Sequence, residues 1–149
     1  MLNRRYIRVK VFQALYSYYQ SGSQDVGHYE KELLKSINSI YDLYTYMLLL
    51  LMELKDLAQK QINQAKDKRL PSHEDLNPNT KFVDNKVFGI LNENLAFNRH
   101  VDAKKLSWHL EESMLKKILQ QVKQSEDYEQ FMQKSNGNFN DDKEFLIRI

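Results

Sequence analysis

The stretch LLKSINSIYDLYTYMLLLLMELKDLA, residues 33–58, decides the fold, because its apolar residues repeat at heptad spacing over four heptads. Two series with a period of seven, offset by four residues, make up the pattern: Leu33, Ile40, Met47 and Leu54, and Ile37, Tyr44, Leu51 and Ala58. Further apolar residues widen the stripe beyond the seam of a two-stranded coiled coil. We therefore predict one long helix over residues 26–65, packed against several neighbours. A coiled-coil dimer through the same two series is the alternative.

The composition outside this stretch also favours an all-helical protein. The 149 residues include four glycines and two prolines, too few for the many turns of a β-sandwich or barrel. The sequence contains no cysteine, which excludes a disulfide scaffold and a thiolate zinc site. We predict a single all-α domain over residues 1–149, a multi-helix bundle around the long central helix.

Capping residues and apolar periodicity predict the remaining helices. Asn3 caps a first helix that runs to Gln20, where Ser21-Gly22-Ser23 ends it. One face of this helix is apolar, and it is formed by Ile7, Val11, Ala14, Leu15 and Tyr18. We expect a loop over 66–80, a helix that begins at residue 79 or 81 and ends at 98, and a link at 101–106. After it we expect a helix over 107–123, a short helix capped by Ser125, and a loop over 136–140.

The last nine residues, 141–149, read as the first two turns of an amphipathic helix. The helix stops on Ile149 without a glycine, a proline or a basic last turn. Exposed apolar helix ends usually need a partner. From this pattern we expect the chain to be the N-terminal portion of a longer protein.

Neither a membrane segment nor an enzyme signature is found in the sequence. The most apolar run, residues 46–52, is seven residues long, against the ~20 that span a bilayer. There is no phosphate-binding glycine loop and no nucleophile elbow, and the four histidines lack metal-binding spacing. We expect a cytoplasmic protein that is not an enzyme, with no catalytic residues, cofactor or metal and no membrane partner.

The first helix carries the residues that suggest a function. Residues 1–20 hold four basic side chains and no acidic one, with Arg4 and Arg8 four residues apart and Arg5 adjacent. Guanidinium groups contact phosphates and stack on bases, and interspersed tyrosines such as Tyr16 offer stacking surfaces to unpaired bases. This composition predicts a surface for single-stranded nucleic acid. A solvated basic face with aromatic core residues is the alternative.

The segment Asn3-Arg-Arg-Tyr-Ile-Arg-Val-Lys-Val-Phe-Gln-Ala-Leu-Tyr-Ser-Tyr18 resembles the opening helix of NusB, the bacterial transcription antitermination factor. That family begins with an R-R-x-x-R stretch that runs into a Q-A-L-Y signature. Arg4, Arg5 and Arg8 match the arginines, and Gln13 to Tyr16 match the signature. The resemblance covers about 16 residues. The long second helix and the region after it look like the extended N-terminal half of the longer NusB homologues of Bacteroidetes.

The resemblance implies an all-helical RNA-binding protein that acts in transcription antitermination and termination. The family binds the single-stranded boxA element of ribosomal RNA leader transcripts together with the ribosomal protein NusE, within an RNA polymerase antitermination complex. Its RNA surface carries over to Arg4, Arg5, Arg8 and Tyr16. The family's NusE contact lies in a C-terminal half that has no counterpart here.

Two other functions remain open from the sequence. NusB-like helical domains also occur fused to ribosomal RNA methyltransferases, whose catalytic part would lie outside this chain. The second is a helical protein-interaction module. In it, residues 33–58 pack against a partner helix or against the same helix of a second copy, and the basic face is incidental.

Overall fold

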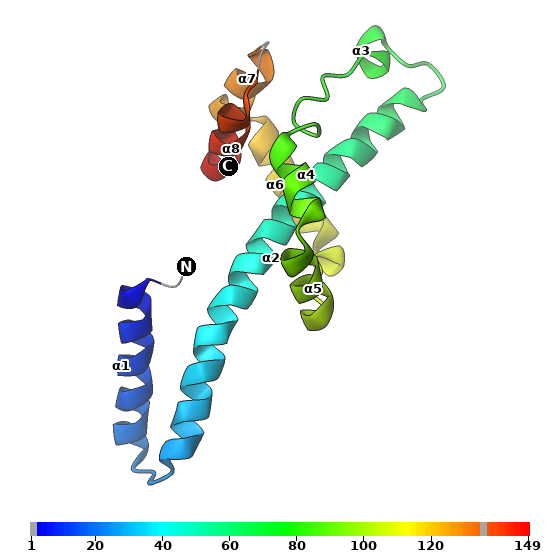
Figure 1. Ribbon diagram of the computed structural model, residues 1–149. Helices are drawn as coiled ribbons and strands as arrows, with labels where there is room; N and C mark the ends of the chain where they lie inside the picture. Colours follow the sequence, from blue (N-terminus) through cyan, green and yellow to red (C-terminus); the bar gives the residue numbers. More distant parts are fainter. Residues whose placement is uncertain (1–2, 135–136) are drawn as a thin grey trace. The chain divides into compact units, whose positions relative to one another are not determined.

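The computed structural model describes residues 3–134 and 137–149, in which all regular secondary structure is helical (Figure 1). The predicted all-α fold with one long helix is confirmed, since α2 (Val26–Lys66) runs through 41 residues. The chain divides into two compact units, Met1–Thr45 and Tyr46–Ile149, and α2 contributes to both. We call them the N-terminal and the C-terminal unit.

The N-terminal unit is a helical hairpin formed by α1 (Arg4–Ser21) and the first part of α2. The Asn3 side chain caps α1, accepting a hydrogen bond from the backbone N–H of Arg5 at 3.1 Å. Gly22 ends the helix with a φ of 62°, a left-handed conformation that glycine adopts without a side-chain clash. Both predicted ends of the first helix are therefore confirmed.

The two helices of the hairpin meet through an aromatic contact. The rings of Tyr18 and Tyr29 pack edge to face with their centroids 5.5 Å apart. Val11 and Ala14 are half-buried on the same side of α1. Leu15 belongs to the same apolar stripe, but its residue surface is 51% exposed. It lies at the edge of the stripe, where a single neighbouring helix leaves it uncovered.

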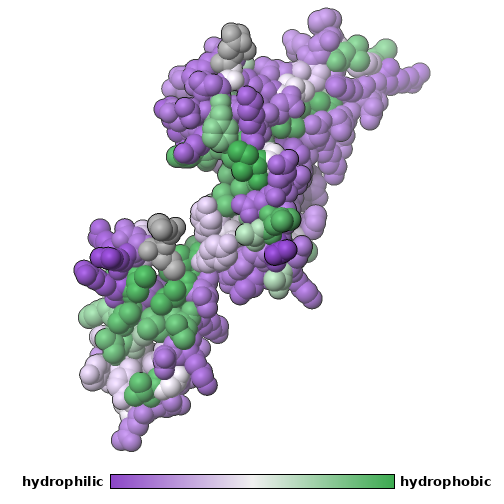
Figure 2. Space-filling view, in the orientation of Figure 1, coloured by the Kyte–Doolittle hydropathy of each residue, from purple (hydrophilic) through white to green (hydrophobic). Residues whose placement is uncertain are grey.

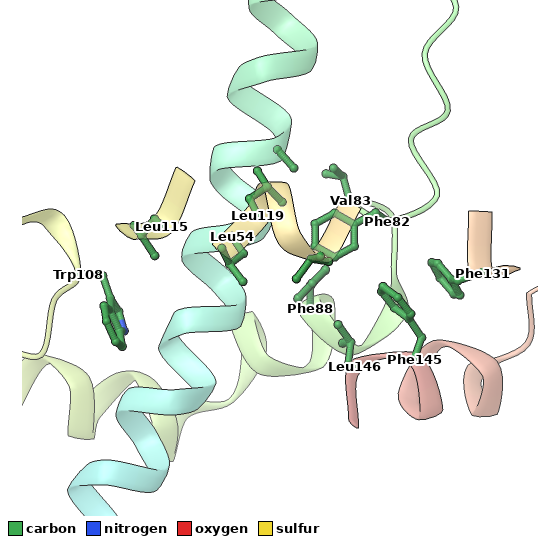
Figure 3. Packing of buried hydrophobic residues seen from close by; sticks show 12 residues of the cluster. Leu54, Phe82, Val83, Phe88, Trp108, Leu115, Leu119, Phe131, Phe145 and Leu146 are labelled. Atoms are coloured by element: carbon green, nitrogen blue, oxygen red, sulfur yellow. The ribbon is translucent and has the colours of Figure 1, made fainter. Parts of the chain in front are cut away.

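The C-terminal unit holds the hydrophobic core, built on the second part of α2. Leu54 and Ala58 of α2 are buried, and they belong to a cluster whose other helices are α4 (Lys86–Glu93), α6 (Glu112–Lys123), α7 (Glu126–Gln133) and α8 (Phe139–Arg148). Figure 3 shows Leu54 and Leu119 among the side chains of this cluster. The packing of the central helix against several neighbours thus agrees with the sequence prediction.

Stacked aromatic rings fill the side of the core next to α8. Phe131 and Phe145 are parallel, with centroids 4.2 Å apart, and Phe82 meets Phe145 edge to face at 6.1 Å. All three are buried. They join α7 and α8 to the segment before α4, three regions separate in the sequence.

Asparagine caps divide the helix that we predicted over residues 79–98. Asn85 begins α4, since its side chain accepts the N–H of Val87 at 2.9 Å. Asn94 begins α5 (Leu95–Lys104), accepting the N–H groups of Ala96 and Phe97. Asparagine side chains compete in this way with the helix hydrogen bonds. The predicted link at 101–106 is consequently helical up to Lys104.

Two other predicted boundaries also differ in the structure. The predicted loop over 66–80 contains a four-residue helix, α3 (His73–Leu76), which begins with a capping box formed by Ser72 and Asp75. The predicted helix over 107–123 begins instead as the 3-10 turn His109–Glu111 before α6. Ser125 caps α7 as predicted, accepting the N–H of Tyr128 at 3.2 Å.

The final helix differs from its prediction at both ends. It begins at Phe139 after the cap Asn138, so only part of the predicted 136–140 loop is non-helical, and Asn136 lies outside the described residues. Phe145 and Leu146 are buried in the core of this chain, and the basic Arg148 lies in the last turn. The expectation that the apolar residues of this helix need an outside partner is therefore wrong for these two.

Among the described residues, no helix is both long and apolar enough to cross a membrane.

Candidate nucleic-acid interface

The four predicted RNA-contacting residues lie on one exposed side of α1. Arg4, Arg5, Arg8 and Tyr16 are all exposed to solvent, and Tyr16 retains 58% of its surface. At 3.6 residues per turn, the four fall within an arc of about 120°. The structure therefore brings the three arginines and the tyrosine onto a common face, which we call the arginine face.

The arginine face is positively charged. In the part of the chain that the structure describes, no carboxylate forms a salt bridge with Arg4, Arg5 or Arg8. The first turn of α1 holds no acidic residue either. Cations at a helix N-terminus oppose the helix dipole. Local helix stability therefore does not explain the arginines, whereas an anionic partner would.

An aromatic strip continues the arginine face toward the end of α1. The ring of Tyr16 lies nearly parallel to that of Phe12, at 23° and a centroid distance of 6.5 Å. The Tyr16 hydroxyl accepts a hydrogen bond from the Gln20 side chain at 3.2 Å, which fixes its direction. Phe12 and Tyr19 expose 68% and 77% of their surfaces. These rings offer uncovered π-faces to unpaired bases.

Phe12 is the residue of this face that the sequence analysis missed. It lies four positions after Arg8 and four before Tyr16, so the i, i+4 spacing would have placed it between them. From the sequence, only the tyrosines of this helix were expected to offer exposed rings. Together with Tyr16 and Tyr19, Phe12 forms an exposed aromatic patch, which is more informative than a single exposed apolar residue.

Lys10 lies outside the arginine face. It lines a groove of about 390 Å³ on the other side of α1, together with the polar side chains Gln13, Ser17, His28 and Glu32. The helical rotation between Arg8 and Lys10 is about 200°. A strand of nucleic acid laid along the arginines would not reach this lysine.

The described residues provide no grouping suited to metal chemistry. In residues 3–134 and 137–149, no three histidine, aspartate or glutamate side chains cluster as a metal ion would require. The face on α1 is formed by cations and aromatic rings, so it is equipped for binding by charge and stacking.

Comparison of the chain with family models, curated proteins and solved structures found no match.

Proposed function

We propose that this protein binds single-stranded RNA through the arginine face and acts in the cytoplasm as a transcription antitermination and termination factor on boxA-like leader transcripts. One observation carries the proposal: three arginines that form no salt bridge with any carboxylate of the described residues share one side of α1 with a row of exposed rings. The resemblance of residues 3–18 to the opening helix of NusB supports the choice of RNA over other anions.

The chemistry of binding consists of positioning and stacking, with no covalent step. Arg4, Arg5 and Arg8 would contact phosphates, since a guanidinium matches phosphate oxygens with two parallel hydrogen bonds. Tyr16 would stack on an unpaired base. Phosphate contacts supply affinity with little sequence information, and stacking and base-edge contacts supply selectivity.

Partners beyond RNA follow from the resemblance. The ribosomal protein NusE and the RNA polymerase antitermination complex would join the protein on the leader transcript. In the family, the NusE contact belongs to a C-terminal half, so we assign no residue of this chain to it.

RNA binding at two or more salt concentrations tests the proposal. The protein should bind a single-stranded boxA-like RNA more tightly than a scrambled RNA of the same length. Three phosphate contacts on a single strand give a slope of about −2 for log affinity against log salt. Absence of any salt-dependent RNA binding would refute the proposal.

A charge-matched pair of double variants identifies the contacting face. Arg4→Ala with Arg8→Ala should weaken binding and flatten the salt slope, since two phosphate contacts are lost. Lys31→Ala with Lys35→Ala removes the same charge from α2 and should change the slope little, because Lys31 and Lys35 lie on a different helix from the arginine face. Equal effects of the two pairs would indicate that only net charge matters and would refute the assignment to α1.

A further inference from the structure

The two sides of the N-terminal hairpin differ in chemistry. The groove that contains Lys10 is lined mainly by polar side chains. The opposite groove, of about 210 Å³, is lined by apolar residues of both helices, among them Leu15, Tyr19, Val26 and Leu33. The hairpin is therefore amphipathic as a whole, with one side suited to water and the other to a partner.

Large apolar side chains extend this groove into a continuous surface, which we call the apolar side. Figure 2 shows hydrophobic residues gathered over the hairpin, at the lower left of the view. At 3.6 residues per turn, those on α1 fall within about 60° of arc and those on α2 within about 80°. The residues that each expose more than half of their surface are Phe12, Leu15, Tyr19, Val26, Leu34 and Tyr44.

The hairpin does not bury a core of its own. Among the described residues of the N-terminal unit, Thr45 at its end is the only buried one. Amphipathic helices draw most of their stability from packing their apolar face against other parts of the protein. The apolar side chains that would normally form the core between packed helices therefore face solvent.

We propose that the apolar side packs against the same side of a second copy of this chain, so that two hairpins form a four-helix bundle. The three aromatic side chains alone expose about 400 Å² per chain, if each presents ~200 Å² when uncovered, and the half-exposed aliphatic side chains Leu15, Val26 and Leu34 enlarge this area. The total approaches the area that one partner contributes to a stable interface of standard size, about 800 Å². A two-fold arrangement closes the surface on itself and leaves no apolar side open.

The charges at the ends of the apolar side select an antiparallel arrangement of the two hairpins. Arg4 and Arg8 lie on this side at the beginning of α1. Glu30, which lines the apolar groove, lies at the other end, beside the α1–α2 turn. In an antiparallel pair, whose two-fold axis runs perpendicular to the helices, opposite ends meet, so the arginines of one copy would face Glu30 of the other, twice per dimer. Opposite charges at such a rim orient the partners.

The oligomeric state of the chain in solution tests this inference independently of any RNA binding. Sedimentation over a range of concentrations should show a reversible shift from one chain of 17.8 kDa to twice that mass. A single-chain mass at all concentrations would overturn the inference, and so would assemblies that grow beyond two copies.

Matched double variants on α1 locate the interface. Leu15→Glu with Tyr19→Glu places two charges on the apolar side and should raise the dimer dissociation constant by about 100-fold or more. Gln13→Glu with Ser17→Glu adds the same charge to the polar groove and should leave the constant near that of the wild type. Far-UV circular dichroism verifies that both variants keep their helices. A dimer that survives the first pair would overturn the inference.

A charge exchange tests the antiparallel arrangement without disturbing the apolar contacts. Glu30→Arg should weaken the dimer about tenfold, because like charges then meet at both ends of the bundle. Adding Arg8→Glu to this variant should restore most of the affinity. Failure of the second substitution to restore it would show that Glu30 does not face Arg8 across the interface.

Discussion

The Trp108 indole donates its Nε1–H to the backbone carbonyl of Tyr46 at 3.1 Å, while the two rings stack with centroids 4.1 Å apart. The Tyr46 hydroxyl in turn donates to the carbonyl of Ser107 at 3.2 Å. These reciprocal contacts fasten the segment before α6 to α2 across 62 positions of sequence. Trp108 is buried, and it is the single tryptophan of the chain.

Replacing Trp108 by alanine and by phenylalanine should separate the contribution of the hydrogen bond to stability from that of the ring packing. Trp108→Ala removes both and should lower the free energy of unfolding by about 3–5 kcal/mol. Trp108→Phe keeps an aromatic ring against Tyr46 and should lose about 1–2 kcal/mol, most of it from the hydrogen bond. Urea denaturation followed by far-UV circular dichroism measures both values. Equal losses for the two variants would show that the ring contact contributes nothing.

The Lys81 side chain should stabilise the C-terminal end of α7. Its ammonium donates to the carbonyl of Phe131 and, at 2.6 Å, to that of Lys134, and it lies 4.4 Å from the centre of the Phe131 ring. A cation favours the negative end of a helix dipole. Lys81→Met keeps the apolar stem and should lower the free energy of unfolding by about 1–3 kcal/mol.

Lys86→Met is the control for this variant. Lys86 is exposed, and its hydrogen bond to Asp142 comes from its backbone N–H, which the substitution preserves. The control should therefore unfold at nearly the same urea concentration as the wild type. If the control loses as much stability as Lys81→Met, the loss comes from the change in net charge and not from the contacts of Lys81.

Asp141 should make the start of α8 sensitive to acid. Its hydrogen bond with the Lys134 ammonium, assisted by the backbone N–H of Asn138, holds the pKa of the Asp141 carboxyl below its ordinary value of 3.8. Since the folded state has the lower pKa, the stabilisation is present above pH 3.8 and is lost as the pH falls through the folded-state pKa.

Thermal unfolding of Asp141→Asn against the wild type measures this contribution. The variant should melt at a lower temperature than the wild type at pH 6, and the difference should vanish in strong acid, where both side chains are neutral. A difference that persists unchanged at low pH would show that the lost capping geometry, and not the charge, is responsible.

RNA and a second copy should compete for α1, because both proposals place their contacts on overlapping residues. Arg8 belongs to the arginine face and also lies at the rim of the apolar side. By mass action, a ligand that binds only the single chain draws the dimer apart. Titrating boxA-like RNA into concentrated protein should therefore reduce the dimer fraction, with scrambled RNA as the control. A complex that contains RNA and two chains would contradict the competition.

The sequence by itself determined the elements whose causes are local. The heptad series predicted the long helix, and Asn3, Gly22 and Ser125 predicted helix ends, because a cap acts on backbone groups within a few positions of itself. The common arc of Arg4, Arg5, Arg8 and Tyr16 on α1 also follows from their spacing along one helix. These features depend on the chain's own geometry and need no distant partner.

Only the tertiary structure decided which apolar residues are covered. Leu54 and Tyr44 belong to the same heptad pattern, yet Leu54 is buried and Tyr44 is 59% exposed. The contact between Lys81 and the end of α7 likewise spans 50 positions, so no local sequence pattern predicts it. Periodicity shows that a stripe is apolar, but burial depends on which helices the rest of the chain places against it.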